Sequence, residues 1–317
     1  MLEILKKAVN EDSLTSTPTM SDPTHEWADY CELVCLISSD SISSEDIKKR
    51  VGISADFEPK DVIERSKSLR EDKISGIVED AFSLMRLRQS LLTDMYPFVV
   101  NEDGQVSESN VSYSHKQIIY TLLLLSANLK YVKHFNNFTS DFEVICLYSM
   151  RSFLPNANVK LFGSSNVCSL GDEDKFINTK LKQRCQELGE FLSIDIHNDT
   201  INLIPEKNLG DGGLDIVATI DMNDKRISHP VFFAQCACGK DAWMQKQLST
   251  SHLEWDKWLH TYQTSIQNYI FVPSFLMTND KEWIDKTDIT HTILIDRFRI
   301  LTLCNEFDTT VLSLNNL

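Results

Sequence analysis

The sequence has no apolar run long enough to cross a membrane. A transmembrane helix needs roughly 18 or more consecutive apolar residues, and the longest candidate, residues 118–129, is interrupted by tyrosine, threonine, serine and asparagine. The first residues, 1–7, also lack the basic-then-apolar order of a secretory signal. The chain is therefore expected to be cytoplasmic.

Basic residues are scarce relative to acidic ones. The chain carries 31 Lys and Arg residues against 46 Asp and Glu residues, which gives a net charge of -15. A protein that grips nucleic acid over its whole surface needs an excess of Lys and Arg to neutralise phosphate. The composition argues against that class, but it is compatible with a local basic groove or with partner subunits that supply the basic surface.

Several common catalytic motifs are missing from the sequence. There is no G-x-x-x-x-G-K-[ST] loop, so the chain has no built-in ATPase of the P-loop kind. There is also no G-x-S-x-G nucleophile elbow and no H-E-x-x-H helix. Any catalytic site in this chain must therefore be built from a less common arrangement of residues.

The eight cysteines mostly lie inside apolar runs. In a cytosolic chain they are expected to stay reduced and to pack as small apolar side chains. Cys236 and Cys238 lie two residues apart on one face of an expected strand. Without a second pair or a nearby histidine this is poor zinc spacing, so a zinc-binding protein remains the third interpretation, which metal analysis would decide.

Hydrophobic spacing divides the chain into three parts. Residues 1–25 are polar and are expected to be flexible. Residues 26–135 show mostly helical spacing, which predicts an all-α N-terminal domain with an adaptor role. Residues 139–317 alternate between strand and helix patterns, which predicts an α/β domain with a mixed sheet flanked by helices.

The elements expected in the third part follow from these patterns. Strands are predicted over 159–162, 201–204, 214–220, 230–236, 269–275 and 292–295. Helices are predicted over 141–153, 174–192, 243–260 and 297–303.

Two of these strands each carry one oxygen-bearing side chain among apolar residues. Asp215 follows a Gly-Asp-Gly-Gly-Leu turn, and burying its carboxylate is costly unless a cation or a donor compensates it. Gln235 lies in the next strand, where its side-chain oxygen and the backbone carbonyl of Cys236 are possible ligands for a divalent ion. The structural alternative is that Asp215 caps the glycine turn and Gln235 bonds to backbone.

The two strands together resemble the PD-(D/E)XK, or restriction-endonuclease-like, nuclease superfamily, and in particular its Mrr-type branch. The resemblance rests on Gly210-Asp211-Gly212-Gly213-Leu214-Asp215 followed by Phe233-Ala234-Gln235-Cys236, and it covers roughly residues 139–300. It implies that Asp215 and Gln235 hold the metal ion. Asp141-Phe142-Glu143 is similar to the opening of the branch's first core helix, which implies that Glu143 supports the site.

The chain departs from this family pattern at one position. Where the family has a lysine two residues after the glutamine, this sequence has Ala237. The resemblance gives that lysine the task of polarising the attacking water and stabilising the charge of the transition state. Lys240 and Lys246 are the candidate replacements, and for each the alternative is a solvated surface lysine.

A shorter motif, which spans residues 235–239 and continues to Trp243, Lys246 and Gln247, resembles restriction-endonuclease-like proteins of bacterial anti-phage operons. This resemblance implies the effector nuclease of a multi-protein defence complex, whose partners help to bind DNA. The resulting hypothesis is a Mg²⁺- or Mn²⁺-dependent DNA endonuclease. The main alternative is a catalytically inactive nuclease fold that serves as a scaffold or binding subunit.

Overall fold

The computed structural model describes residues 14, 16–38, 40–55, 64–109, 112–132, 137–163, 170–224, 226–239, 242–284, 286–305, 307 and 309–312. The chain divides into two compact units. The first unit is Met1–Phe135 with Ser274–Ile284, and the second is Asn136–Pro273 with Asp285–Leu317. Residues 274–284, which the sequence assigned to the domain 139–317, therefore fall in the first unit. Most of the segment 1–25 that was expected to be flexible lies outside the described residues.

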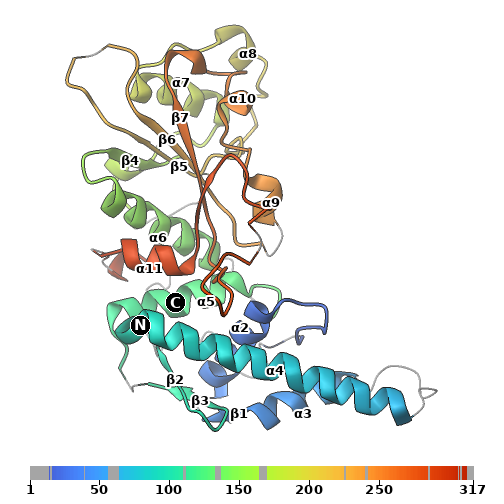
Figure 1. The fold of residues 1–317 in the computed structure, drawn as a ribbon. Helices are drawn as coiled ribbons and strands as arrows, with labels where there is room; N and C mark the ends of the chain where they lie inside the picture. The colour runs from blue at the N-terminus through green and yellow to red at the C-terminus, as the bar shows by residue number, and fades with distance from the viewer. Residues whose placement is uncertain are drawn as a thin grey trace. The chain divides into compact units, whose positions relative to one another are not determined.

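The first unit contains helices and a small sheet (Figure 1). Its helices are α2 (Thr24–Ser38), α3 (Ser44–Ala55), α4 (Glu64–Leu92) and α5 (His115–Ala127). Strands β1 (Ile42–Ser43), β2 (Phe98–Val100) and β3 (Gln105–Glu108) form an antiparallel sheet in the order β1-β3-β2. The prediction of an all-α N-terminal domain was therefore wrong.

The sheet exists because the chain reverses at Asn101–Gly104. Gly104 has a φ of 72°, a left-handed conformation that glycine adopts without a steric penalty. Asn101 N donates to Gln105 O at 2.9 Å, which closes the hairpin. Val100 and Val106 pair across the two strands, and both are buried. These strands are so short that helical spacing on either side of them dominated the sequence pattern.

A buried charge cluster ties α2 to α4 within the first unit. The guanidinium of Arg88 on α4 is fully buried and contacts Asp29 and Glu32 of α2, both at 2.7 Å. The hydroxyls of Tyr96 and Tyr120 each donate to the Glu32 carboxylate at 2.7 Å. The cluster supplies the counter-charges and hydrogen bonds that a buried arginine requires.

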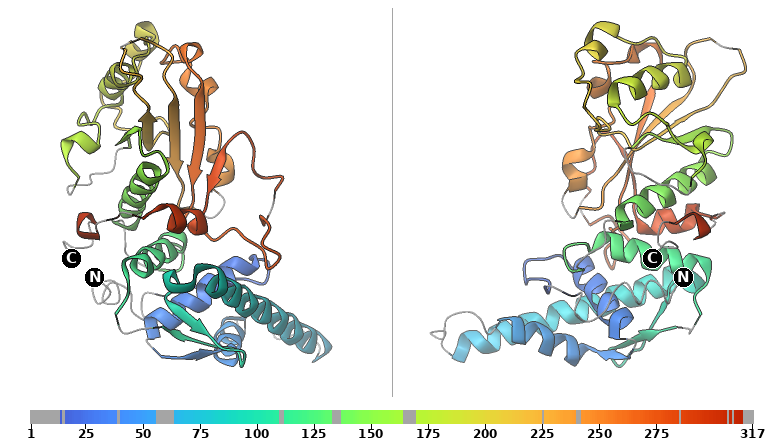
Figure 2. Two further views of the ribbon diagram at one scale, coloured as in Figure 1. Left: turned by 60° about the vertical axis from the view of Figure 1, so that its left-hand side comes forward. Right: turned by 180° about the vertical axis from the view of Figure 1, so that it is seen from behind.

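The second unit is built on a five-stranded mixed sheet, seen edge-on and face-on in Figures 1 and 2. The sheet order is β4-β5-β6-β7-β8. Strand β5 (Ile216–Thr219) pairs antiparallel with β4 (Asn158–Leu161) and with β6 (Val231–Cys236). Strands β7 (Ile266–Phe271) and β8 (Ile293–Ile295) continue the sheet from β6 in parallel. The predicted α/β class with a mixed sheet is confirmed for this unit.

The helices of the second unit are α6 (Asn137–Phe153), α7 (Leu181–Leu192), α8 (Asn198–Asn202), α9 (Ala242–Lys246), α10 (His252–Trp255) and α11 (Arg297–Leu303). Helix α7 turns an apolar stripe toward the sheet, where Leu188 joins Val217 and Phe233 in the core cluster. None of the described helices combines the length and hydropathy that crossing a bilayer requires.

Two predicted elements in this unit were wrong. The segment 201–204 is not a strand, because Ile201 belongs to the short helix α8 and packs into the apolar core. The predicted helix 243–260 is broken into α9 and α10, since Ser251 caps a new helix by accepting from Glu254 N. Met244 and Leu248, which lie within the predicted helix 243–260, are exposed.

Candidate metal centre

Asp215 lies immediately before β5, where three segments of the sheet meet. Its backbone N donates to Ala234 O at 3.0 Å, and its carbonyl accepts from Phe162 N at 2.7 Å and Gly163 N at 3.1 Å. Its side chain is buried, with 4% of the residue surface exposed. The hydrogen bonds of the sheet thus fix the position of this carboxylate from both sides.

One oxygen of the Asp215 carboxylate is held by two donors from β6. Asp215 Oδ2 accepts from Gln235 Nε2 at 2.5 Å and from the backbone N of Cys236 at 2.6 Å. The two side chains that the sequence singled out on neighbouring strands are therefore in direct contact. The contribution of Cys236 seen here is its N–H; a ligand role for its carbonyl oxygen stays a prediction.

The other oxygen of Asp215 and a carboxylate oxygen of Glu143, on α6, both lie beside Gly163. A Cβ built on Gly163 would lie 3.3 Å from Asp215 Oδ1 and 3.2 Å from Glu143 Oε2. The two carboxylate oxygens are thus no farther apart than the sum of these distances. Both oxygens therefore border the position that a side chain at residue 163 would occupy.

This arrangement changes the acidity of Asp215. Burial raises the pKa of its carboxyl well above the ordinary range, and the negative charge of Glu143 raises that pKa further. The Cys236 N–H and the positive charge of Lys246 act in the opposite direction. A divalent cation between the two carboxylates would reverse the balance, since a bound ion is the largest local charge in such a site.

The donor set fits a hard, oxygen-binding cation better than zinc. Mg²⁺ is commonly held by one or two carboxylates and keeps several waters, and Asp215 Oδ1 and Glu143 Oε2 both lie beside Gly163. The described part of the chain contains no group of three or more His, Cys, Asp or Glu residues arranged to hold a metal. Burial also raises the pKa of the Cys236 and Cys238 thiols well above their usual value, which disfavours the thiolates that zinc requires.

Of the two candidate lysines, only one can be placed. Lys246 is the last residue of α9, its side chain is exposed, and its charge is close enough to lower the pKa of Asp215. Lys240 lies outside the described residues. Ala237, at the position where the family resemblance would put a lysine, is buried, and its N–H donates to Phe271 O at 2.9 Å.

Sequence reasoning missed three residues that build this site. Gly163 lies beside an oxygen of each carboxylate, and Ser249 donates to Gln235 Oε1 at 2.9 Å. Arg184 of α7 is buried and donates to the carbonyls of Phe162 and Gly210, which ties together the two loops beside Asp215. Its position on the buried stripe of residues 181–192 is a signal that could have identified it, because an arginine there needs carbonyl or carboxylate partners.

No known protein family, curated protein or solved structure matches the chain. The function of the chain must therefore be inferred from the residues and geometry of the site.

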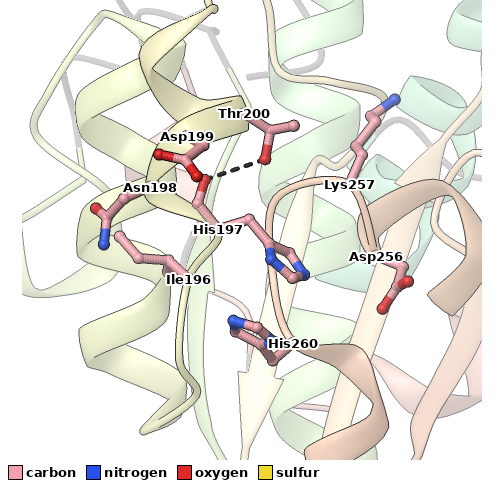
Figure 3. Close-up of a pocket in the computed structure, with 8 residues that line it drawn as sticks. All are labelled: Ile196, His197, Asn198, Asp199, Thr200, Asp256, Lys257 and His260. Carbon is pink, nitrogen blue, oxygen red and sulfur yellow. Dashed lines mark hydrogen bonds between the residues drawn. The ribbon is translucent and has the colours of Figure 1, made fainter.

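A polar pocket lies at the loops that precede α8 and follow α10 (Figure 3). It encloses about 530 Å³ and includes His197 and His260, whose ring centroids are 3.7 Å apart. At that separation the rings contact each other and leave no room for a substrate atom between them. The pocket's lysine, Lys257, points away from the two rings and its Nζ lies 4.4 Å from the centre of the Trp258 ring. We assign no reaction to this pocket.

Proposed function

We propose that the second unit is a Mg²⁺-dependent nuclease that hydrolyses phosphodiester bonds in DNA. The observation that carries the proposal is the pair of carboxylates, Asp215 and Glu143, which both place an oxygen beside Gly163. Gln235, the third residue implied by the resemblance to restriction-endonuclease-like proteins, is hydrogen-bonded to Asp215. The contact between Asp215 and Gln235, and the position of Glu143 beside the same glycine as Asp215, support the proposal.

Each residue has a distinct task in the proposed reaction. Asp215 and Glu143 would hold the ion, and the side-chain oxygen of Gln235 and the backbone carbonyl of Cys236 would be its further protein ligands. When bound, the ion supplies Lewis-acid polarisation of the phosphate and acidifies a bound water. Gln235 Nε2 and Cys236 N–H occupy Asp215 Oδ2, so that Oδ1 is the oxygen left toward Glu143. Lys246, and Lys240 as the second candidate, would place positive charge near the phosphate as negative charge develops in the transition state.

The overall charge supports a reaction that depends on partners. A net charge of -15 opposes binding to DNA by the chain alone. We propose that the protein is the nuclease subunit of a multi-protein anti-phage defence complex, and that its partners contribute the basic surface and the regulation.

The experiment is a plasmid-cleavage assay with Mg²⁺ or Mn²⁺, with EDTA as the metal-free control. Asp215→Asn and Glu143→Gln remove the negative charge of the proposed ligands with little change in side-chain size. We expect each to reduce nicking by at least about 100-fold, the upper end of the effect of residues that merely support a metal ligand. Asp199→Asn, in the histidine pocket, is the matched control and is expected to cleave like the wild type.

Two outcomes would overturn the proposal. Cleavage by Asp215→Asn at the wild-type rate would put the active site elsewhere. Absence of cleavage by the wild-type protein, even with the products of neighbouring genes added, together with absence of Mn²⁺ binding, would remove the enzyme altogether.

That second outcome would favour a catalytically inactive scaffold. Two features support this alternative. Ala237 replaces the lysine of the family pattern, and Asp215 Oδ2 accepts hydrogen bonds from two protein donors. In that case the fold would serve as a binding module within the complex.

A further inference from the structure

The turn that follows α9 brings one hydroxyl group into contact with the candidate metal centre. Ser249 Oγ lies 2.9 Å from Gln235 Oε1 and 2.6 Å from the carbonyl oxygen of Lys246. It therefore contacts both the side chain of the candidate ligand and the backbone of the candidate lysine. Neither contact is required to form the sheet.

Ser249 is itself held firmly in place. Its backbone N donates to Lys246 O at 3.0 Å, and its carbonyl accepts from Trp255 Nε1 at 3.2 Å. On its other side lies the glycine turn, where a Cβ built on Gly213 would come within 2.9 Å of Ser249 Cβ. A side chain fixed in this way can determine the orientation of the group it contacts.

The group that Ser249 contacts is the side-chain amide of Gln235, which can adopt either of two orientations. In the structure Gln235 Nε2 faces Asp215 and Oε1 faces Ser249. If Gln235 is to ligate a cation, its oxygen must turn toward the ion instead. A serine hydroxyl can donate or accept, so Ser249 can pair with Oε1 in the first orientation and with Nε2 in the second.

We propose that Ser249 is a positioning residue for Gln235, which keeps the amide paired in both orientations and thereby allows its oxygen to serve as a metal ligand. This inference rests on the proposed metal site. It predicts that removing the hydroxyl weakens ion binding only through Gln235. The hydroxyl has one proton, which Gln235 Oε1 and the Lys246 carbonyl share in the observed orientation. In the metal-bound orientation Ser249 can accept from Nε2 while it donates to Lys246 O, so Ser249→Ala removes more from that orientation and disfavours it.

The test is Mn²⁺ affinity of the full chain, measured by the loss of the free-ion electron paramagnetic resonance signal. We expect Ser249→Ala to bind Mn²⁺ about 10-fold more weakly, the usual effect of losing a residue that orients a metal ligand. Ser249→Thr retains the hydroxyl and should restore most of the affinity. Ser90→Ala is the matched control, because Ser90 Oγ also donates to a carbonyl three residues earlier, on Leu87, at 2.8 Å.

A double-mutant cycle separates positioning from a general effect on folding. In a Gln235→Ala background, Ser249→Ala should cause no further loss of Mn²⁺ affinity. An equal loss in both backgrounds, an unchanged affinity in Ser249→Ala, or no recovery in Ser249→Thr would overturn the role of Ser249 and leave the metal site standing. Failure of the wild-type chain to bind Mn²⁺ would overturn the metal site, and with it this inference.

Discussion

Asp215 is an acid that folding removes from water and surrounds with donors on one side and another carboxylate on the other. Because burial and Glu143 raise its pKa, the folded chain binds a proton there more tightly than the unfolded chain does. The stability that this protonation contributes is complete below the ordinary carboxyl pKa of about 4. It is lost as the pH rises toward the higher pKa of the folded state.

Asp215→Asn tests that sign. The variant stays uncharged at every pH, so we expect it to gain stability relative to the wild type as the pH rises from about 4 to neutral. Urea unfolding at several pH values measures the difference. Mg²⁺ should raise the melting temperature of the wild type but not that of Asp215→Asn. A wild type that gains stability over the variant with rising pH would contradict the assignment.

Gly163→Ala tests whether the ion binds beside Gly163, between the two carboxylates. The added methyl group would lie 3.2 Å from Glu143 Oε2 and 3.3 Å from Asp215 Oδ1, which is where an ion and its waters would have to fit. We expect Mn²⁺ affinity and cleavage to fall together while the fold, followed by circular dichroism, persists. Gly76→Ala on α4, where nothing lies within 4 Å of the added Cβ, is the control and should stabilise the helix by roughly 0.5–1 kcal/mol. Undiminished ion binding in Gly163→Ala would exclude this space as the site.

At the scale of elements, the sequence predicted what local pattern determines. Strands β5 and β6 were found because apolar runs are bounded by turn residues, and Asp215 and Gln235 because a polar group interrupts each run. Ser249 and Gly163 could not be found in this way, since their contacts join segments far apart in the sequence. The break between α9 and α10 was missed because the apolar spacing of 243–260 favours one helix, whereas the cap at Ser251 starts another.

The contact between α2 and α4 supplies a prediction at the same scale. Arg88→Met would leave Asp29 and Glu32 buried without their shared cation, and we expect a loss of about 3–5 kcal/mol in the free energy of unfolding. Arg86→Met, also on α4 but half-buried, should change that free energy by less than about 0.5 kcal/mol. Urea unfolding of both variants measures the contrast. Equal stabilities would show that the charge cluster contributes little.

At the scale of the whole molecule, the negative net charge weakens the binding of DNA. The chain has 46 acidic residues against 31 basic ones, so its long-range interaction with phosphate is repulsive outside any local groove. The proposed role as one subunit of a complex follows from this imbalance, because the basic surface must then come from another chain.

The corresponding prediction concerns DNA affinity. Asp215→Asn, which keeps the substrate intact, is expected to bind a short fluorescent duplex with a Kd no tighter than about 10⁻⁶ M at physiological salt, the range of non-specific binding. Fluorescence anisotropy measures this value. Tighter binding by the isolated chain would mean that a local basic groove is sufficient and that partners are not needed for affinity.

The proposed function depends above all on Asp215 and Glu143 holding a divalent cation between them. Anomalous diffraction from crystals soaked in Mn²⁺ tests it directly, because the ion's own signal locates it. We expect an anomalous peak about 2.1 Å from both Asp215 Oδ1 and Glu143 Oε2, the usual distance between a small divalent ion and oxygen. A peak at the His197–His260 pocket alone, or no peak near Asp215 at a saturating concentration, would contradict it.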